Sequence, residues 1–448
     1  MLKIDIDYSK IKDNLEFYKK LTGYKSDYVV PTLKANAYSF ELEKILKLYE
    51  KQNIFCIYST DEGVRARQIR GDAKIFVFSA LFPEDIAIYK KYNLIPVINS
   101  FEQLKISPFK EIALQFNTGM NRSGIEISEL KQVQTYIKQN NINVFLIMSH
   151  LCCADDIKSP VNQIQFDNYK KICDTFDDTK IIRSLLATDA TENFYDTYGR
   201  YANSSRIGFG LYYNKVWCLK IKCDVINDYL PVGLKDGFLS DYAIDGYVVA
   251  EGEKVKITKI TEDRIFLEKN LNGKEVIILG DEVPDYNAIC GSDSLEAIPR
   301  LLAKNININV EGQKLWTEND GYYSRIMEVR EISEDGVVGY GATREVKKGV
   351  RLAVYAGGYL DGTLRVLSNS GAVVYVENTN GDFVACELYG RISMDQSILN
   401  IGNNDINIGA KVIIYDKDHP KDRFCKNINK TETEIFYMLD KSYRVRHV

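Results

Sequence analysis

The chain has 448 residues, 45% hydrophobic and 27% charged, a composition typical of a soluble globular protein of more than one domain. A net charge of −4 gives no field that attracts nucleic acid or a membrane surface, and no apolar run is long enough to span a bilayer. The first residues contain no apolar h-region, so we expect no secretory signal, and the nine cysteines and three histidines show no metal-ligand spacing. We therefore expect a cytoplasmic protein with reduced thiols, no metal, and no nucleic-acid or membrane partner.

The first half of the chain alternates short β-rich runs with longer stretches of helical character. Residues 9–21 place Ile11, Leu15 and Tyr18 on one helix face, and residues 126–139 have a similar character. The β-rich runs are 28–33, 54–59, 74–79, 96–99, 112–117, 144–149, 181–187 and 206–213. Strands that alternate with helices indicate a parallel sheet, and eight such runs favour a TIM-type (βα)₈ barrel over an open doubly wound sheet.

After residue 213 the pattern changes to alternating strands with glycine-containing turns, which predicts mostly β structure. This region also contains an internal repeat, which predicts a duplicated β domain. The matching segments, in order, are 230–239 with 352–364, 263–267 with 396–400, and 276–279 with 412–415, each copy then entering a helix-like stretch at 294–303 or 431–440. In this alignment, Met394 and Asp395 stand opposite Thr261 and Glu262, and Tyr359 stands opposite Leu234.

Lys34 closes the first predicted barrel strand. Catalytic groups of barrels collect at the C-terminal ends of the strands, where burial lowers the pKa of a lysine amine and allows it to form a Schiff base. On position alone, a surface lysine at a strand end is the simpler interpretation. Other strand ends favour a site, because Arg122 follows strand five, His150 closes strand six and Arg206 begins strand eight.

This set of side chains suits pyridoxal phosphate. The cofactor needs a lysine, a partner for its ring nitrogen and donors for its phosphate. Backbone N–H groups at Gly208 and Phe209 are placed to donate to a phosphate.

The sequence resembles alanine racemase, a family of pyridoxal-phosphate enzymes with a barrel followed by a β domain. The matching segments occur in family order at 34–38, 118–125, 149–150, 206–212, 338–343, 358–362, 390–396 and 442–445. The resemblance implies interconversion of L- and D-alanine by two bases, one on each face of Cα. It also implies a homodimer whose active sites are shared between subunits.

The resemblance implies a role for each matching residue. Lys34 is expected to hold the cofactor and act as one base, and Tyr340, supplied by the partner subunit, as the other. Arg206 is expected to bond the pyridine nitrogen, with His150 supporting Arg206 and Tyr340. Further cofactor contacts are expected from Tyr38, Arg122, Gly208, Phe209 and Tyr443. Substrate contacts are expected from Arg122, Met394, Tyr359, Arg365 and Arg391.

The sequence departs from the family pattern at three site positions. Gln115 stands where the family usually has a lysine, often carbamylated; its amide oxygen can still accept a hydrogen bond from Arg122. Thr188 and Asp189 stand where an Asn-Ser pair is usual, and a carboxylate beside a phosphate is unfavourable unless it points away.

The largest departure is an inserted segment, which divides the chain into three predicted domains. These are a barrel (1–213), an inserted degenerate copy of the β domain (214–319) and a complete β domain carrying the second base (320–448). The insert has no counterpart of the Gly-Tyr-Gly segment 339–341. Three alternatives stay open: a racemase of serine, ornithine or lysine, a non-catalytic barrel that binds the cofactor, and a structural protein that uses the extra β domain. The insert also leaves two arrangements open. In the first, which reciprocal two-fold contacts favour, the complete β domain reaches the partner's barrel; in the second, it folds back onto the barrel of its own chain.

Overall fold

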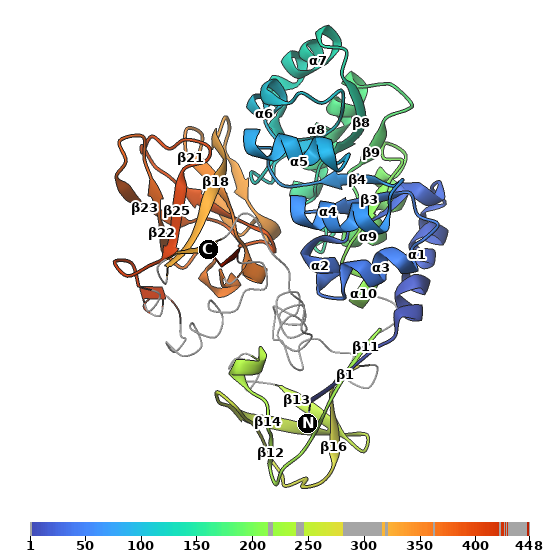
Figure 1. Cartoon of the computed structure of the whole chain (residues 1–448), viewed down its shortest axis with the longest axis vertical. Coiled ribbons are helices and arrows are strands. Elements are labelled where there is room, and N and C mark those ends of the chain that lie inside the picture. The colour runs from blue at the N-terminus through green and yellow to red at the C-terminus, as the bar shows by residue number, and fades with distance from the viewer. Residues whose placement is uncertain are drawn as a thin grey trace.

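The computed structural model describes residues 2–213, 218–238, 246–280, 316–318, 321–361, 363–420, 423–424, 426, 428 and 446–447. Figure 1 shows a barrel, a β domain beside it in orange and red, and a separate sheet in yellow-green below it. No helix in these ranges is both long and apolar enough to cross a membrane.

Eight parallel strands of the described residues form the predicted barrel, which is thereby confirmed. The strands are β2 (Val29–Pro31), β3 (Ile54–Ile57), β4 (Lys74–Val77), β5 (Ile95–Ile98), β6 (Glu111–Asn117), β8 (Asn143–Met148), β9 (Ile182–Ser184) and β10 (Ser205–Ile207). Bridges at Thr32–Cys56 and Leu186–Ser205 join β2 to β3 and β9 to β10, and the β10–β2 pair closes the ring. Each strand falls within or overlaps a predicted run, although the last run turns helical after Ile207.

Ten helices of the described chain accompany these strands. They are α1 (Tyr8–Thr22), α2 (Lys34–Tyr38), α3 (Leu42–Leu48), α4 (Thr60–Ile69), α5 (Ile86–Lys91), α6 (Phe101–Ile106), α7 (Leu130–Gln139), α8 (Pro160–Thr175), α9 (Thr188–Tyr198) and α10 (Gly210–Tyr213). Local signals fix several of their ends. Asp7 accepts from Ser9 N at the start of α1, Gly23 ends α1 at φ +60°, and Ser59 and Glu62 form a capping box on α4.

A second, antiparallel sheet, here called the inserted sheet, includes the first strand of the chain. Its order is β1-β11-β16-β13-β14-β15-β12. The strands are β1 (Leu2–Ile6), β11 (Leu219–Asp224), β12 (Tyr229–Leu230), β13 (Tyr247–Ala250), β14 (Glu253–Ile260), β15 (Ile265–Leu267) and β16 (Glu275–Leu279). The predicted division placed residues 1–213 in the barrel, but β1 pairs with β11 from Leu2–Cys223 to Ile6–Leu219. Its alternating half-exposed pattern suits a sheet edge rather than a barrel interior.

The C-terminal β domain is built on β18 (Gly321–Glu331), which pairs with β25 and β21 and so closes six strands into a ring. The others are β21 (Arg351–Ala356), β22 (Val373–Glu377), β23 (Phe383–Leu388), β24 (Gln396–Asn400) and β25 (Lys411–Tyr415). Outside the ring, β17 (Trp316–Glu318) pairs with β18, and β26 (Arg446–His447) pairs with β17. Between β18 and β21 the chain makes the Tyr340 excursion, residues 332–350. It contains the hairpin β19 (Gly336–Val338) and β20 (Arg344–Val346) around a short turn, Tyr340–Ala342.

The two sheets follow the same path. The order β11-β16-β13-β14-β15-β12 repeats as β18-β25-β22-β23-β24-β21, as expected if the sequence repeat reflects a shared fold. The inserted sheet lacks the Tyr340 excursion, because its chain passes from β11 to β12 through a tight turn at Val225–Asp228 that an Ile226–Tyr229 bridge closes.

Matching hydrogen bonds correct the alignment of the two copies by one residue. Leu234 N donates to Thr261 O and Lys235 N to Glu262 O, as Tyr359 N donates to Ser393 O and Leu360 N to Met394 O. Thr261 and Glu262 therefore stand opposite Ser393 and Met394, not Met394 and Asp395. The inserted sheet keeps an acid, Asp263, opposite Asp395. The predicted match of Leu234 with Tyr359 agrees with these bonds.

Candidate active site

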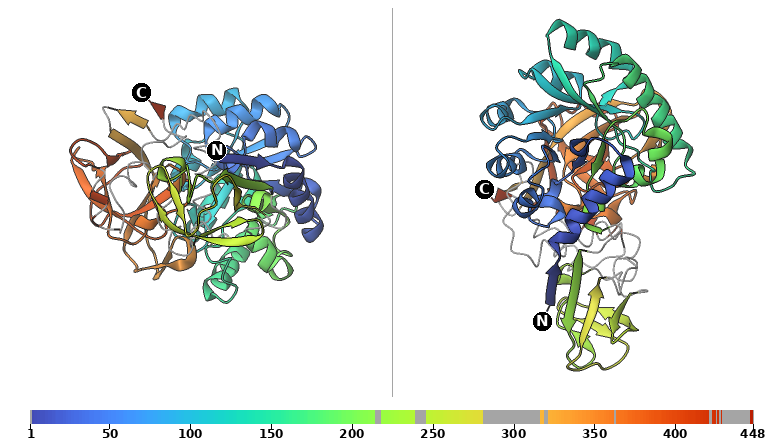
Figure 2. Two further views of the ribbon diagram at one scale, coloured as in Figure 1. Left: turned by 90° about the horizontal axis from the view of Figure 1, so that it is seen from below. Right: turned by 90° about the vertical axis from the view of Figure 1, so that its right-hand side faces the viewer.

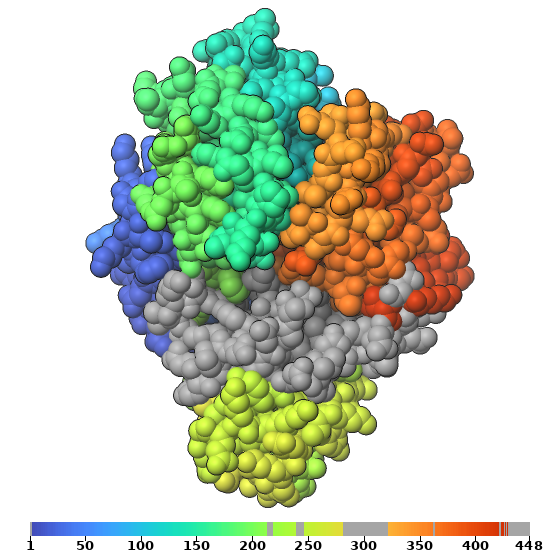
Figure 3. Space-filling view, turned by 180° about the vertical axis from the view of Figure 1, so that it is seen from behind, coloured from blue at the N-terminus to red at the C-terminus, as the bar shows by residue number. Residues whose placement is uncertain are grey.

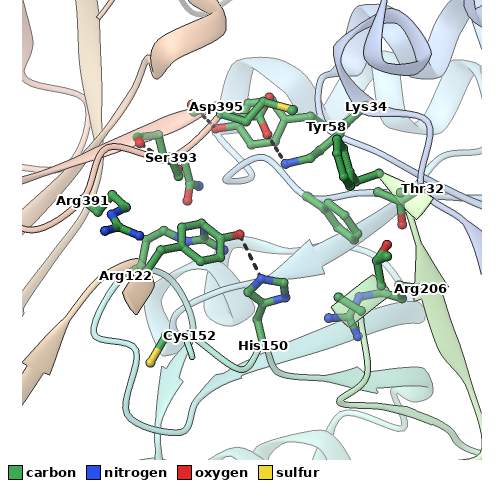
Figure 4. Close-up of a pocket in the computed structure, with 18 of the residues that line it drawn as sticks. Thr32, Lys34, Tyr58, Arg122, His150, Cys152, Arg206, Arg391, Ser393 and Asp395 are labelled. Atoms are coloured by element: carbon green, nitrogen blue, oxygen red, sulfur yellow. Dashed lines mark hydrogen bonds and ion pairs between the residues drawn. The ribbon is translucent and has the colours of Figure 1, made fainter. Parts of the chain in front are cut away.

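One pocket lies at the C-terminal ends of the barrel strands, where the C-terminal β domain meets them. Strand ends and following loops provide one wall, and the Tyr340 excursion and the loop before β24 provide the other. Figure 4 shows Lys34, Arg122, His150 and Arg206 reaching it from the barrel, and Arg391, Ser393 and Asp395 from the β domain.

The predicted site residues converge on this pocket. It is lined by Lys34, Tyr38, Arg122, His150, Arg206, Gly208, Phe209, Tyr340, Tyr359, Arg365, Arg391 and Met394. Tyr443 lies outside the described residues. The predicted departures Gln115, Thr188 and Asp189 also line the pocket.

Sequence reasoning passed over several lining residues, including Thr32, Tyr58, Phe78, Met148 and Cys152. The first four stand at or just after the ends of β2, β3, β4 and β8. Applying the strand-end rule to every strand, rather than to the charged residues alone, would have found them. Cys152 follows His150 in the next loop and carries no comparable signal.

Lys34 begins a left-handed turn. Ala35, Asn36, Ala37, Tyr38 and Ser39 all have φ between 53° and 73°, a conformation that costs roughly 1–2 kcal/mol per residue without glycine. Such strain persists only where surrounding contacts fix the backbone.

A buried carboxylate provides those contacts. Glu62 is 1% exposed and accepts hydrogen bonds from the backbone N–H groups of Asn36, Tyr58 and Ser59. Asn36 Oδ1 in turn accepts from Leu42 N and from the Arg65 guanidinium. The left-handed turn is thus held to α4 and to the start of α3, and it aims Lys34 and Tyr38 into the pocket.

The amine of Lys34 forms an ion pair with the β domain. Lys34 Nζ lies 2.6 Å from Asp395 Oδ2, and the Asp395 side chain is 4% exposed. Tyr58 Oη donates to the Asp395 carbonyl oxygen at 3.1 Å, which fixes the backbone beside the carboxylate. Asp395 therefore holds the lysine amine at the junction of the two domains.

Tyr340, from the C-terminal β domain, contacts His150 and Arg122 of the barrel. Its Oη lies 2.9 Å from His150 Nε2, and the Arg122 guanidinium carbon lies 5.2 Å from the Tyr340 ring centre. Burial lowers the pKa of His150 well below its usual value, and the cations Arg122, Arg206 and Lys34 lower it further. His150 is therefore neutral at physiological pH and can accept a hydrogen bond from the Tyr340 hydroxyl.

Arg206 is 5% exposed and donates to the carbonyl oxygens of Ser184 and Ser149. These two bonds hold the guanidinium at the ends of β8 and β9. Burial lowers the pKa of Arg206, but an arginine this basic stays charged. The side chain is thus a fixed cation in the pocket wall.

Gly208 makes a cradle beside Tyr38. A Cβ at Gly208 would lie 2.2 Å from Tyr38 Oη, so only glycine leaves room for the phenol there. Burial raises the pKa of Tyr38 well above its usual value, which keeps its hydroxyl protonated as a donor. An anionic phosphate fits between such donors. Arg122 Nε is also buried and has no partner within the described residues, as expected of a group awaiting a ligand.

The structure shows the surroundings of the three residues that depart from the family pattern. Gln115 Nε2 donates to Ser123 O at 3.1 Å, and no hydrogen bond of the described chain joins Gln115 to Arg122, although the amide oxygen is chemically able to accept one. Thr188 Oγ1 accepts from Gly210 N at 3.2 Å. Asp189 lies in the pocket, where burial, followed by Asp155 and Glu192, raises its pKa to about 6.

Two family models match the chain. The alanine racemase N-terminal domain matches residues 6–215 and the C-terminal domain matches residues 321–447, together about three quarters of the chain. Residues 216–320, close to the predicted insert, are matched by neither model.

Similar proteins carry the same name. Alanine racemase of Rickettsia akari is 26% identical over 366 residues, covering 72% of this chain and 98% of that protein, and alanine racemase of Fusobacterium nucleatum is 27% identical, covering 64% and 91%. The solved alanine racemase of Clostridium difficile 630 has a similar fold, with a TM-score of 0.57 at 20% identity over 72% of this chain and 96% of that one. The chain belongs to the alanine racemase family.

Proposed function

We propose that this chain interconverts L- and D-alanine with pyridoxal phosphate as cofactor. The observation that carries the proposal is the meeting of Lys34, from the barrel, and Tyr340, from the C-terminal β domain, at one pocket. Each is a group that gains or loses a proton, and inversion at Cα needs one such group on each face.

The residues present suit the cofactor. Lys34 would hold it covalently, Tyr38 with the Gly208 and Phe209 backbone would hold its phosphate, and Arg206 would face its ring nitrogen. Pyridoxal phosphate, when bound, withdraws electrons from Cα of the amino acid and so makes its proton acidic. The unpartnered Arg122 Nε and the Gly208–Tyr38 cradle support this assignment.

Proton transfer falls to two side chains in this proposal. Lys34 Nζ takes or gives the proton on one face of Cα, and Tyr340 Oη does so on the other. Asp395, paired with Lys34, compensates the charge of the amine when it holds the proton. Neutral His150 accepts a hydrogen bond from Tyr340 and orients its hydroxyl, while the Arg122 guanidinium lies over the Tyr340 ring and holds the ring in place.

The pocket also suits a small substrate. Tyr359 is 6% exposed and stands beside Met394 in the wall formed by the β domain, with the Arg365 guanidinium 5.8 Å from its ring. We assign the substrate carboxylate to Arg122 and the Met394 backbone, and the entry path to Tyr359, Arg365 and Arg391. A wall of this bulk leaves space for a methyl side chain and disfavours lysine or ornithine.

Two finer features remain predictions from the sequence. These are the cytoplasmic location and the homodimer with shared active sites. The arrangement of Tyr340 and His150 within one chain bears directly on the second and is taken up below.

The test is exchange of the Cα proton in heavy water. We expect deuterium to enter L- and D-alanine faster than serine, ornithine or lysine, and borohydride reduction to fix a pyridoxyl group on Lys34. A pyridoxyl group on Lys34 without exchange in any of these amino acids would indicate a non-catalytic cofactor-binding protein. Faster exchange in lysine or ornithine would overturn the assignment of alanine.

A further inference from the structure

The excursion that carries Tyr340 is bonded to the barrel of its own chain. Gly339 N donates to Met120 O at 2.9 Å and Gly341 N donates to Cys152 O at 2.7 Å, one on each side of Tyr340. Asn121 Nδ2 donates to Val337 O at 2.8 Å. Backbone hydrogen bonds on both sides therefore fix Tyr340 against the barrel. The Tyr340–His150 hydrogen bond is thus part of a larger interface between the C-terminal β domain and the barrel.

Buried ionic groups extend this interface. Arg330 of β18 is bonded to Glu126 and to Gly124 O of the barrel, and its side chain is 7% exposed. Glu328, 3% exposed, accepts from Gly124 N and from Arg330. Charges this deeply buried need their partners, so the barrel loop and β18 complete each other's bonding.

An apolar cluster adjoins the ionic groups. Ala80 and Phe82, which follow β4, pack with Met327, Val338 and Leu352 of the C-terminal β domain, and all five are buried. A mixture of apolar core and satisfied charges is typical of a specific interface. Figure 3 shows the orange domain in direct contact with the teal and green part of the barrel, whereas the inserted sheet lies apart at the lower end.

The inserted sheet is anchored to the same barrel in a different way. Its strand β1 runs directly into α1, and Asp7 N donates to Cys218 O at the start of β11 (Figure 2). The sheet lacks the Tyr340 excursion, and residues 218–238 and 246–280 contribute nothing to the pocket lining. Within its described residues, the β unit tied to the N-terminal strand therefore has no counterpart of Tyr340, and the unit that carries Tyr340 lies on its own barrel.

We propose that the active site is completed within a single chain, so that one protomer is a full catalytic unit and needs no tyrosine from a partner. The inserted sheet occupies the N-terminal strand, which leaves the C-terminal β domain free to fold back onto the mouth of the barrel. The alternative is a dimer in which two chains exchange their C-terminal β domains and make the same contacts between chains. Only the catalytic arm of the test rests on the proposed function.

A cross-link across the interface tests the arrangement without any reference to activity. Arg325 of β18 is paired with Glu84, whose side chain is 59% exposed. The variant Arg325→Lys would place an amine at this carboxylate, where a zero-length carbodiimide can join them. Equal amounts of ¹⁵N-labelled and unlabelled chains would be unfolded together, refolded and cross-linked. The matched control is Arg344→Lys, opposite Glu387 within the C-terminal β domain, where any product is intrachain.

We expect both variants to give cross-linked peptides of one isotope only, at the mass of a single chain on a denaturing gel. Exchange of domains between chains would instead give mixed-isotope peptides, about half of the total for random pairing, in Arg325→Lys and not in the control. Mixed peptides at that level would overturn the proposal.

Complementation supplies the catalytic arm. Lys34→Ala and Tyr340→Phe chains are refolded together, beside wild-type chains treated in the same way. We expect the mixture to stay as inactive as either variant alone. A site shared between chains would recover on the order of a quarter of wild-type activity, because half of the dimers would be mixed and one of two sites in each would be intact. Inactive refolded wild-type protein would count against the proposed function, while the isotope result would still decide the arrangement.

Discussion

At the scale of single residues, the pocket pairs each of the two side chains proposed to transfer a proton with a partner from the other domain. Lys34 of the barrel meets Asp395 of the β domain, and Tyr340 of the β domain meets His150 of the barrel. Neither group is set up by its own domain alone. The chemistry of the site therefore depends on the docking of the two domains as much as on the identity of the residues.

Replacing Tyr340 with phenylalanine isolates its hydroxyl. The variant keeps the ring over Arg122 and removes only the group bonded to His150. We expect turnover of both alanine enantiomers to fall on the order of 10²-fold or more, with the cofactor absorbance retained. Steady-state kinetics and an absorbance spectrum check this, and turnover close to wild type would remove Tyr340 from the mechanism.

Asp189 predicts a pH dependence of cofactor affinity. Its pKa is raised to about 6, so the carboxyl is neutral below pH 6 and becomes negative as the pH rises through 6. A negative charge beside a phosphate weakens binding, so the affinity of the apoprotein for pyridoxal phosphate should fall over that range. Asp189→Asn removes the titrating group while keeping its shape.

Comparing wild type with Asp189→Asn separates the effect of the Asp189 carboxylate on cofactor affinity from the effect of protons that bind to the cofactor itself. We expect the variant to bind several-fold more tightly than wild type at pH 8 and about equally at pH 5. Fluorescence titration of the apoprotein at both values measures this. Equal affinities at pH 8 would show that the carboxylate points away from the phosphate.

At the scale of elements, the left-handed turn after β2 is the part of the barrel that sequence patterns do not reveal. The segment reads as an ordinary strand-to-helix connection, and no glycine marks the five residues with positive φ. The conformation is set by Glu62, a residue distant in sequence that bonds Asn36 N. Local preference cannot show such a tertiary constraint.

Removing the Glu62 carboxylate should loosen this turn. Glu62→Ala would leave the buried N–H groups of Asn36, Tyr58 and Ser59 without their acceptor. We expect the free energy of unfolding to fall by at least about 2 kcal/mol and the cofactor to dissociate faster, because Lys34 and Tyr38 lie on the released segment. Denaturant unfolding and cofactor release are the measurements.

Glu62→Gln is the matched control, since its amide oxygen can still accept from one or two of these groups. It should lie between wild type and Glu62→Ala in both measurements. If both variants retained wild-type stability and cofactor retention, the turn would not depend on this side chain.

At the scale of the whole molecule, the barrel could be predicted from the sequence because its eight strands alternate with helices. The barrel side of the pocket could be predicted because its residues stand at strand ends, whereas the residues from the C-terminal β domain were expected only from the family resemblance. The path of β1 could not be predicted, since five residues carry no sign of a partner more than two hundred positions away. The sequence alignment of the two β copies was wrong by one residue in the segment between β12 and β15. The sequence match there is too weak to fix the length of each turn, whereas the backbone hydrogen bonds of the structure fix it.

Because the inserted sheet and the C-terminal β domain are separate, we expect the same kind of substitution to have different effects on racemisation in each. Val248 of β13 and Val374 of β22 are both fully buried and stand at corresponding strands. Val248→Asp should disrupt the inserted sheet while cofactor absorbance and racemisation persist. Val374→Asp should abolish racemisation, because it disrupts the domain that positions Tyr340 and Asp395.

Limited proteolysis checks that each substitution acts on its own sheet, with cleavage expected within 246–280 for the first variant and within 363–420 for the second. Activity lost equally in both would mean that the inserted sheet supports the pocket.

The tight turn at Val225–Asp228 has a consequence for engineering. In the inserted sheet, β11 and β12 are joined by this turn alone, without a counterpart of the Tyr340 excursion. The six strands that both β units share therefore do not need the excursion in order to fold. The excursion between β18 and β21 can therefore be shortened, exchanged or randomised in a library without rebuilding the strands beneath it. Transplanting residues 332–350 in place of 225–228 would give the second frame a tyrosine of its own and create a protein with two β units capable of serving a barrel.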